Sequence, residues 1–472
     1  MVSLLSTRPV EAAARPKRER RADLIAGGAA LGLVAIAAAV GLVLDVTLHG
    51  DPHFPGAADT FGEWPILGEL APHVGPGTPP AIMIAVAAVA WGPGLAARLS
   101  WRVALAAGYL LAVAWTFALV LVDGWRRGAA GQLSSPDEYL AAVPGITDIP
   151  AMLRTFSGRI LDWQPDSWIT HVAGHPPGAT LVFVWLDRIG LSGGGWAAVV
   201  CILVGGAAAV AVPVTVSALG GRDLARAALP FVALLPGAVW LGVSADALFT
   251  GVTATGVALL ALGASALRDG RRRGVAGCVA GGVLLGFGIF LSYGLILIGS
   301  IALAVVLAVR SRAAFVLAVL GALAVVAAFA LAGFWWLDGY RLVVERYYQG
   351  IANARPYHYW VWADLACLVL ATGPAAAAGL RRAAPRLTAG LPGGRAVDDT
   401  YPVLAVVRGA ALAVLAATVS GLSKAEVERI WLPFAVWLVA AAALLPATTR
   451  RGWLAAGAAV ALVMNHVLLT NW

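Results

Sequence analysis

Long runs of apolar residues, separated by short polar stretches, alternate along the whole chain. Most runs approach the roughly 20 residues that an α-helix needs to cross a hydrocarbon core of about 30 Å. The fourteen runs cover residues 24–46, 79–97, 101–123, 176–190, 195–218, 226–243, 246–267, 274–291, 294–309, 314–336, 359–378, 403–420, 430–446 and 453–470. The pattern therefore predicts an all-α, polytopic transmembrane helical bundle. It forms one membrane domain over residues 24–472, preceded by a basic cytoplasmic segment at 1–23.

The amino-acid composition supports a membrane protein. Of the 472 residues, 60% are hydrophobic and only 12% are charged, whereas roughly a quarter are charged in soluble domains. The net charge of +8 does not indicate nucleic-acid binding, because most arginines lie in short clusters between the apolar runs, as a topology signal does. The cysteines lie inside apolar runs and are predicted to be buried rather than disulfide-bonded or metal-binding: Cys201, Cys278 and Cys367.

The positions of the arginine clusters predict the topology. Basic residues concentrate on the cytoplasmic side of membrane proteins, so these clusters place the N-terminus in the cytoplasm and the C-terminus outside the cell membrane. Opposite termini require an odd number of crossings, about 13, so either one run between 176 and 267 does not span fully or two of these runs form one bent hairpin. The weakest is 176–190, because it is short and carries Asp187 and Arg188.

Four longer polar segments are predicted on the extracytoplasmic face: 47–78, 124–175, 338–358 and 421–429. They contain six of the seven histidines and most of the carboxylates. Loops on a rigid scaffold commonly carry function, so we expect any chemistry on this outer face.

The segment 124–175 contains an acidic pair, Asp137 and Glu138, in the sequence SSPDEYL. The sequence predicts a helix start here, with Ser135 as cap and Pro136 at the first position. The acids then either serve only as helix-start residues, or one of them is a general base whose pKa is raised by partial desolvation. A divalent cation on Asp137 or Glu138 is compatible with these residues, although nothing in the sequence requires one.

Two pairs of histidines have the spacing that places both rings on one helix face, where they could bind a metal. They are His49 with His53 and His171 with His175. Prolines interrupt or end both pairs, and no third ligand is evident, so the sequence favours no metal site.

The segment 338–362 interleaves arginines with aromatic residues, including Arg346, Tyr348, Arg355 and Tyr357. Arginine grips phosphate oxygens with two hydrogen bonds, and interfacial aromatics lie at headgroup depth. The segment therefore suits an anionic group carried on a lipid. An ordinary aromatic belt with snorkelling arginines is the alternative.

The segment 420–434 places four charged residues at the outer end of an apolar run: Lys424, Glu426, Glu428 and Arg429. Charges at or within the membrane are costly and commonly mark a substrate pathway or site. The alternative is a solvated helix start.

Four short motifs resemble those of GT-C-type membrane glycosyltransferases, in particular the protein O-mannosyltransferase and aminoarabinose-transferase group. DEY at 137–139 and HPPG at 175–178 occur in the same order as the acidic and Pro-Pro elements of that group. LPGAVWLGVSADALFTG at 235–251 is similar to its helix with a Pro, then a Ser and an Asp. SKAEVERIWLPF at 423–434 resembles a segment of poorly characterised actinobacterial-type members. The likeness covers residues 130 to 435, in patches.

The resemblance implies a GT-C-like fold and an enzyme that transfers a sugar, mannose or arabinofuranose, with inversion from a polyprenyl-phosphate donor. The acceptor would be a glycan, glycolipid or protein of the cell envelope, and no nucleic acid is involved. Asp137 would be the base, with Glu138 as its neighbour or a cation ligand, and His175 would orient donor or acceptor. The phosphate candidates are Arg346, Arg355, Lys424 and Arg429. The other substrate-binding candidates are Tyr139, His171, Tyr348, Tyr357 and Glu428.

One departure leaves an alternative for the base. In that group the acidic loop follows the first transmembrane helix, whereas here it follows the third predicted one. The counterpart could instead be the loop 47–78, with the candidate carboxylates Asp51, Asp59 and Glu63 in the loop and Asp45 just before it. We favour 124–175, because a Pro-Pro helix start follows only that loop.

Two other functions fit parts of the sequence. A transporter or lipid flippase would need ionisable residues within the membrane, and Asp246 is such a residue, although the halves of the chain show no internal symmetry. A non-catalytic subunit of envelope assembly is the second alternative. It predicts that no single charged residue on the outer face matters.

Overall fold

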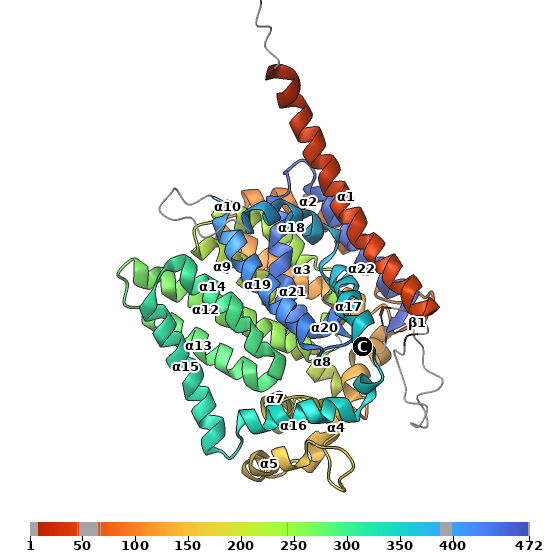
Figure 1. The fold of residues 1–472 in the computed structure, drawn as a ribbon, viewed down its shortest axis with the longest axis vertical. Helices are drawn as coiled ribbons and strands as arrows, with labels where there is room; N and C mark the ends of the chain where they lie inside the picture. The colour runs from red at the N-terminus through yellow and green to blue at the C-terminus, as the bar shows by residue number, and fades with distance from the viewer. Residues whose placement is uncertain are drawn as a thin grey trace, which may run out of the picture.

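The structure is a computed structural model. It describes residues 8–44, 46, 65–66, 68–242, 244–387 and 399–470, with side chains from Lys17 onward. The fold is a bundle of α-helices, shown in Figure 1. The α-helices are α1 (Arg8–Val43), α2 (Thr78–Arg98), α3 (Trp101–Val120), α4 (Tyr139–Ala142), α5 (Ile149–Thr155), α6 (Thr170–Gly174), α7 (Pro177–Arg188), α8 (Gly194–Gly206), α9 (Ala208–Ala218), α10 (Arg222–Ala233), α11 (Ala238–Leu241), α12 (Asp246–Arg268), α13 (Gly274–Leu291), α14 (Gly299–Val309), α15 (Arg312–Leu331), α16 (Trp336–Gln349), α17 (Tyr357–Thr372), α18 (Pro374–Leu387), α19 (Tyr401–Ser420), α20 (Val427–Ile430), α21 (Leu432–Leu438) and α22 (Arg450–Val467).

Two short strands, which the apolar pattern did not predict, join distant parts of the chain. Strand β1 (Gly68–Leu70) pairs antiparallel with β2 (Leu468–Thr470), so the end of α22 is held beside the segment before α2. The remaining regular pieces are a π-helical turn at Trp125–Ala129 and 3₁₀ turns at Gln132–Ser134, Val143–Gly145, Ser157–Arg159, Tyr293–Ile298, Ile351–Asn353 and Val439–Leu444.

Long apolar helices make this chain a multi-pass membrane protein. Within the described ranges, eight helices are long and apolar enough to cross a membrane, and a ninth span results if α17 and α18, bent by 110° at Gly373, are taken together. The eight are Lys17–Val43, Thr78–Arg98, Trp101–Val120, Gly194–Ala218, Asp246–Arg268, Gly274–Leu291, Arg312–Leu331 and Tyr401–Ser420. Helix α1 also continues without a break across residue 23, where the sequence predicted the membrane domain to begin.

The count of about 13 crossings is not confirmed, because several apolar runs do not form one long helix. The run 176–190 becomes α7, whose 12 residues rise only about 18 Å, less than a hydrocarbon core. The run 226–243 is divided between α10 and α11, and 430–446 between α20, α21 and a 3₁₀ turn. Apolar runs that pack inside a bundle need not be long, since protein rather than lipid surrounds them.

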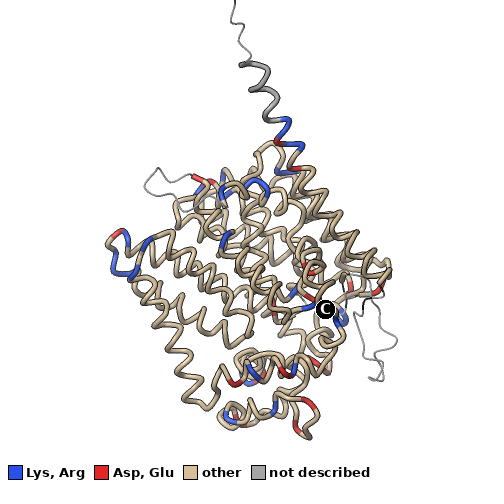
Figure 2. The backbone as a smooth tube through the Cα atoms, viewed as in Figure 1, with Lys and Arg blue, Asp and Glu red and all other residues tan. Residues whose placement is uncertain are grey.

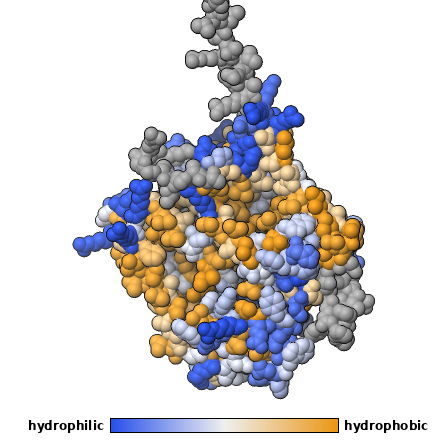
Figure 3. All heavy atoms as spheres, viewed as in Figure 1, coloured by the Kyte–Doolittle hydropathy of each residue, from blue (hydrophilic) through white to orange (hydrophobic). Residues whose placement is uncertain are grey.

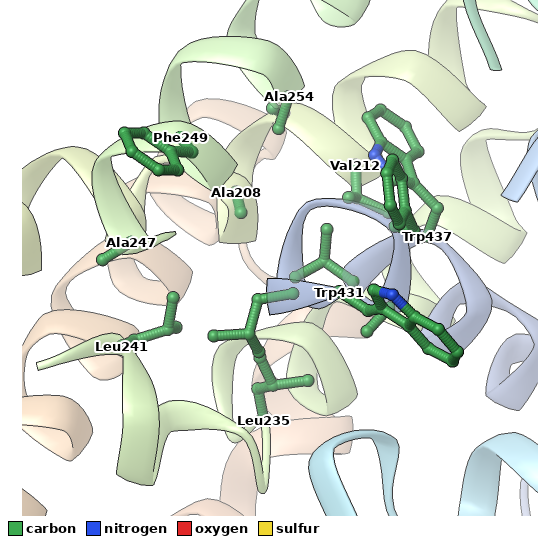
Figure 4. Packing of buried hydrophobic residues seen from close by; sticks show 14 of the residues in the cluster. Ala208, Val212, Leu235, Leu241, Ala247, Phe249, Ala254, Trp431 and Trp437 are labelled. Atoms are coloured by element: carbon green, nitrogen blue, oxygen red, sulfur yellow. The ribbon is translucent and has the colours of Figure 1, made fainter. Parts of the chain in front are cut away.

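Helix α12 is the most enclosed of the eight and packs against α8, α9 and α13. Small residues allow this close contact, as is typical of membrane helices. A Cβ at Gly251 would lie 1.9 Å from the Val204 carbonyl oxygen of α8. Figure 4 shows the neighbouring core, where Val212 of α9 lies beside Trp437.

Polar residues gather at two ends of the bundle, with an apolar band between them (Figures 2 and 3). One end, here called the basic end, carries the arginine-rich turn at 268–273 between α12 and α13. The other, the loop end, carries residues 124–175, 338–358 and 421–429. Cross-contacts join these three segments: Gln349 accepts a hydrogen bond from the Asp162 amide at 2.8 Å, and Tyr347 accepts one from the Lys424 amide at 2.9 Å.

Candidate functional site

The acidic pair of the loop 124–175 lies at the start of a shorter helix than the sequence predicted. Helix α4 begins at Tyr139 and Glu138 occupies the cap position, so Ser135 is not the cap. The backbone leaves a helical path before Glu138 because the Asp137 carbonyl accepts hydrogen bonds from the backbone amide and ring Nδ1 of His171, at 3.1 and 2.9 Å. The two halves of the loop are thereby joined, and Glu138 is directed into the protein, where it is 5% exposed.

Hydrogen bonds to carbonyl oxygens fix the orientation of both loop histidines. Nδ1 of His175 donates to the His171 carbonyl at 2.9 Å, so in each ring Nδ1 carries the hydrogen and Nε2 is free to accept. The two rings stack with centroids 6.4 Å apart, and the Tyr139 ring lies 5.7 Å from that of His175. Pro176 then caps α7, which begins at Pro177, as predicted. His171 and His175 thus hydrogen-bond to backbone carbonyls, and their rings pack against each other and against Tyr139.

Arg429 connects this loop to the membrane core. Its Nη1 donates to Asp246 Oδ2 at 2.9 Å, at the first residue of α12, and its Nη2 donates to Glu426 at 2.8 Å. The same Nη2 lies 3.4 Å from His171 Nε2, the nitrogen left as an acceptor. Arg429 is 5% exposed and Asp246 4% exposed. A buried guanidinium is tolerated here because carboxylates on separate elements face it.

Two further cations, Arg355 and Lys424, lie beside Arg429. Arg355 donates from Nη2 to Glu426 at 2.8 Å and from Nη1 to the Lys424 carbonyl at 2.7 Å. The ammonium of Lys424 donates to the carbonyls of Ala352 and Arg355. Glu426 therefore bridges two arginines from different segments. We call the whole group the polar cluster, composed of Glu138, His171, His175, Asp246, Arg355, Lys424, Glu426 and Arg429.

The backbone that presents Glu426 is strained. Ala425 and Glu426 have φ angles of 67° and 61°, in the left-handed region that side chains other than glycine rarely adopt. The strained turn is held by the amide of Ala425, which donates to Asp364 Oδ1 at 3.1 Å. Backbone strain of this kind concentrates at functional sites, where the surrounding structure imposes it.

Burial and charge move the pKa values of the cluster in different directions. Burial raises the pKa of Glu138 to about 7, despite the opposing effect of Arg429. Burial lowers the pKa of His175 to about 4 and also lowers that of His171. Burial opposes ionisation of Glu426 as well, but Arg355 and Arg429 hold its pKa down to about 2. At neutral pH the cluster therefore has neutral histidines, a charged Glu426 and a Glu138 close to its titration midpoint.

Glu428 lies apart from the polar cluster, although it is two residues from Glu426. It is fully buried, and neither of its carboxylate oxygens accepts a hydrogen bond from the described residues. Burial raises its pKa to about 7.

The structure places some predicted site residues outside the cluster. Asp137 is exposed, and its side chain accepts a hydrogen bond from Thr170 at 3.1 Å. Arg346 forms an ion pair with Asp162. The exposed Tyr357 donates to the Val419 carbonyl. Tyr348, also exposed, has its ring 5.4 Å from the Lys424 ammonium.

Two central members of the cluster were not among the predicted site residues: Asp246 and Glu426. Asp246 had a usable signal, since it is an acid at the start of an apolar run within a motif of the resemblance. Glu426 gave little signal, because its neighbours Lys424, Glu428 and Arg429 are also charged, and only the turn at 425–426 determines which side chain faces inward.

Some of the sequence predictions concern residues that the structure does not describe. The alternative base residues of the loop 47–78 and its neighbour (Asp45, Asp51, Asp59 and Glu63) lie outside the described residues, as do His49 and His53. Among the residues that are described, no group of three or more His, Cys, Asp or Glu side chains is arranged to hold a metal ion.

Comparisons with protein-family models, with curated proteins and with solved structures give no match to this chain. Its functional assignment therefore depends on the chemistry of the polar cluster and on the four motifs in the sequence.

Proposed function

We propose that the chain is an integral membrane glycosyltransferase that moves a sugar from a polyprenyl-phosphate donor to a cell-envelope acceptor, with inversion. One observation carries the proposal: residues from all four motif segments meet in the polar cluster. They are Glu138, His175, Asp246 and Arg429, and the last two are 183 positions apart in sequence yet 2.9 Å apart in space. Packing alone does not require charged residues from four separate segments to be buried together, since burying charge is costly.

Asp137 is the better placed of the two acids to act as base. An inverting transfer needs a carboxylate that takes the proton of the acceptor hydroxyl as the sugar leaves its phosphate. A bulky acceptor can approach Asp137, which is exposed, but not the buried carboxylate of Glu138. Glu138 instead acts as a positioning residue, with its Oε1 lying 3.6 Å from the His171 ring nitrogen that also donates to the Asp137 carbonyl.

The cations of the cluster would stabilise the charge that develops on the departing lipid phosphate through their electric field rather than by direct contact, since Arg355, Lys424 and Arg429 are each only 5–6% exposed. Arg355, Lys424 and Arg429 are fixed in place by carboxylates and carbonyls before any substrate binds. Preorganised cations of this kind lower the cost of forming an anion, because they need little rearrangement during the reaction. The donor would enter from the outer leaflet, with the loop end and the C-terminus extracytoplasmic.

A transporter or flippase remains the second candidate, and one observation favours it. Asp246 and Arg429 form an ion pair where the membrane-spanning helix α12 begins, and such pairs occur along substrate pathways. The two functions differ in which carboxylates they need: the transferase needs Asp137, whereas a transporter needs Asp246 and tolerates loss of the loop acids.

The decisive experiment measures sugar transfer by the purified protein in liposomes that contain polyprenyl-phosphate mannose or arabinofuranose and extracted envelope glycans. Asp137→Asn should reduce transfer at least about 100-fold, the usual contribution of a general base. The control is Asp166→Asn, because Asp166 lies in the same loop and its side chain is 66% exposed; it should retain transfer. Full activity of Asp137→Asn would refute the assignment of Asp137 as the base. Loss of substrate movement only in Asp246→Asn would favour transport.

A further inference from the structure

A cavity of about 520 Å³ opens at the basic end of the bundle, far from the polar cluster. Helix α12 joins the two places, since it begins with Asp246 in the cluster and ends with Arg268 at the cavity. Its 23 residues rise about 33 Å, which is the thickness of a hydrocarbon core. The cavity therefore lies at the opposite membrane surface and takes no part in the proposed transfer reaction.

The charged lining of the cavity favours an anion. Four arginines line it, Arg222, Arg268, Arg271 and Arg273, against a single carboxylate, Asp269. They come from separate elements, because Arg222 begins α10, Arg268 ends α12 and the other two belong to the turn before α13. Arginine suits phosphate oxygens, to which it can donate two parallel hydrogen bonds.

Two further features indicate that the anion is carried on a lipid. Leu262, about two turns before the end of α12, lines the cavity and is 48% exposed, so the lining continues onto apolar surface. Trp101 also lines it, and the Arg222 guanidinium lies 4.7 Å from the Trp101 ring centroid. Tryptophan and arginine together are typical of headgroup depth. A cavity of this volume accommodates a phosphate headgroup, while acyl chains extend over the exposed leucine.

We propose that this cavity, between α9, α10, α12 and α13, binds the phosphate headgroup of an anionic phospholipid of the cytoplasmic leaflet. Basic pockets between helices at this membrane surface are suited to such headgroups. The bound lipid would cover the arginines and hold the turn at 268–273 against the starts of α3 and α10. This site is independent of the proposed transferase function.

The test is a calorimetric titration of the purified full-length protein in a neutral maltoside detergent. The probes are dihexanoyl phosphatidylglycerol, dihexanoyl phosphatidylcholine and inorganic phosphate. We expect phosphatidylglycerol to bind most tightly. The double variant Arg271→Gln/Arg273→Gln should weaken it about 30-fold, since two arginines near an anionic headgroup together contribute about 2 kcal/mol. Lysine at both positions should restore most of the affinity, because the charge is kept.

The matched control is Arg310→Gln/Arg312→Gln, which removes the same charge from the turn between α14 and α15 but not from the cavity. This control should change the Kd less than twofold. If both double variants weakened binding equally, the effect would come from general surface charge and the proposal would be overturned. Phosphatidylcholine that binds as tightly as phosphatidylglycerol would overturn it as well. Inorganic phosphate that binds as tightly as phosphatidylglycerol would show a free-anion site and refute the lipid assignment.

Discussion

Glu426 and Glu428 are two residues apart, and replacing them should change the stability in opposite directions. Glu426 pairs with Arg355 and Arg429, each at 2.8 Å, and its pKa is held at about 2. Glu428 is buried with no hydrogen-bond partner among the described residues, and burial raises its pKa to about 7. We therefore expect Glu426→Gln to lower the free energy of unfolding and Glu428→Gln to raise it at alkaline pH.

The two pKa values set the size of both effects. Each lies about 2.5 from the ordinary value of 4.5, in opposite directions. At 1.36 kcal/mol for each pH unit, either difference corresponds to about 3 kcal/mol. The stabilisation from Glu426 is present above pH 4.5 and is lost as the pH falls through 2. Glu428 has the opposite effect, because its carboxyl is harder to ionise in the folded protein than in the unfolded chain. The free energy of unfolding therefore falls as the pH rises from 4.5 through 7.

Thermal unfolding in detergent, followed by tryptophan fluorescence at pH 5 and pH 8, tests this expectation. Glu428→Gln should raise Tm at pH 8 and change it little at pH 5, since the wild-type carboxyl is already protonated there. Glu426→Gln should lower Tm at both pH values. Glu345→Gln is the control, because Glu345 on α16 is exposed; it should have no pH-dependent effect. A gain from Glu428→Gln that is equal at both pH values, or shifts of the same sign for both variants at pH 8, would refute the reasoning.

Two other predictions concern stability. Arg429→Met should lower the free energy of unfolding, measured with denaturant, by about 3–5 kcal/mol, because it leaves the buried Asp246 carboxylate without its cation. Adding Asp246→Leu should recover part of that loss. A double variant whose loss equals the sum of the two single losses would contradict a direct pairing. Gly251→Ala should cost about 1–3 kcal/mol, because its Cβ would clash with the Val204 carbonyl oxygen, whereas Gly28→Ala in α1, where nothing lies within 4 Å, should be neutral or slightly stabilising. Similar Tm values for the two glycine variants would contradict the close approach of α8 and α12.

Much of the candidate site was accessible from the sequence because polar residues are conspicuous in an apolar chain. Glu138, His171, Lys424 and Arg429 were all selected as charged or titratable residues beside apolar runs, and the structure brings them together. Which acid faces inward could not be read from DE at 137–138, because that depends on the bonds between the Asp137 carbonyl and His171 across the loop. Asp246 was recognised as unusual, but its pairing with Arg429 depends on where the tertiary structure places the start of α12 relative to α20.

The sequence by itself determined that this is a helical membrane protein. The length of an apolar run and the clustering of arginines are local properties, and their effect on membrane insertion does not depend on tertiary contacts. It also determined that the chemistry-bearing residues occur in a few polar segments. Only the tertiary structure decided which apolar runs become long helices, since a run enclosed by protein, such as that of α21, need not match the thickness of lipid. It also decided which charges are paired, because Asp246 and His171 are distant from Arg429 in the sequence and only tertiary packing brings them within 2.9 and 3.4 Å of its guanidinium.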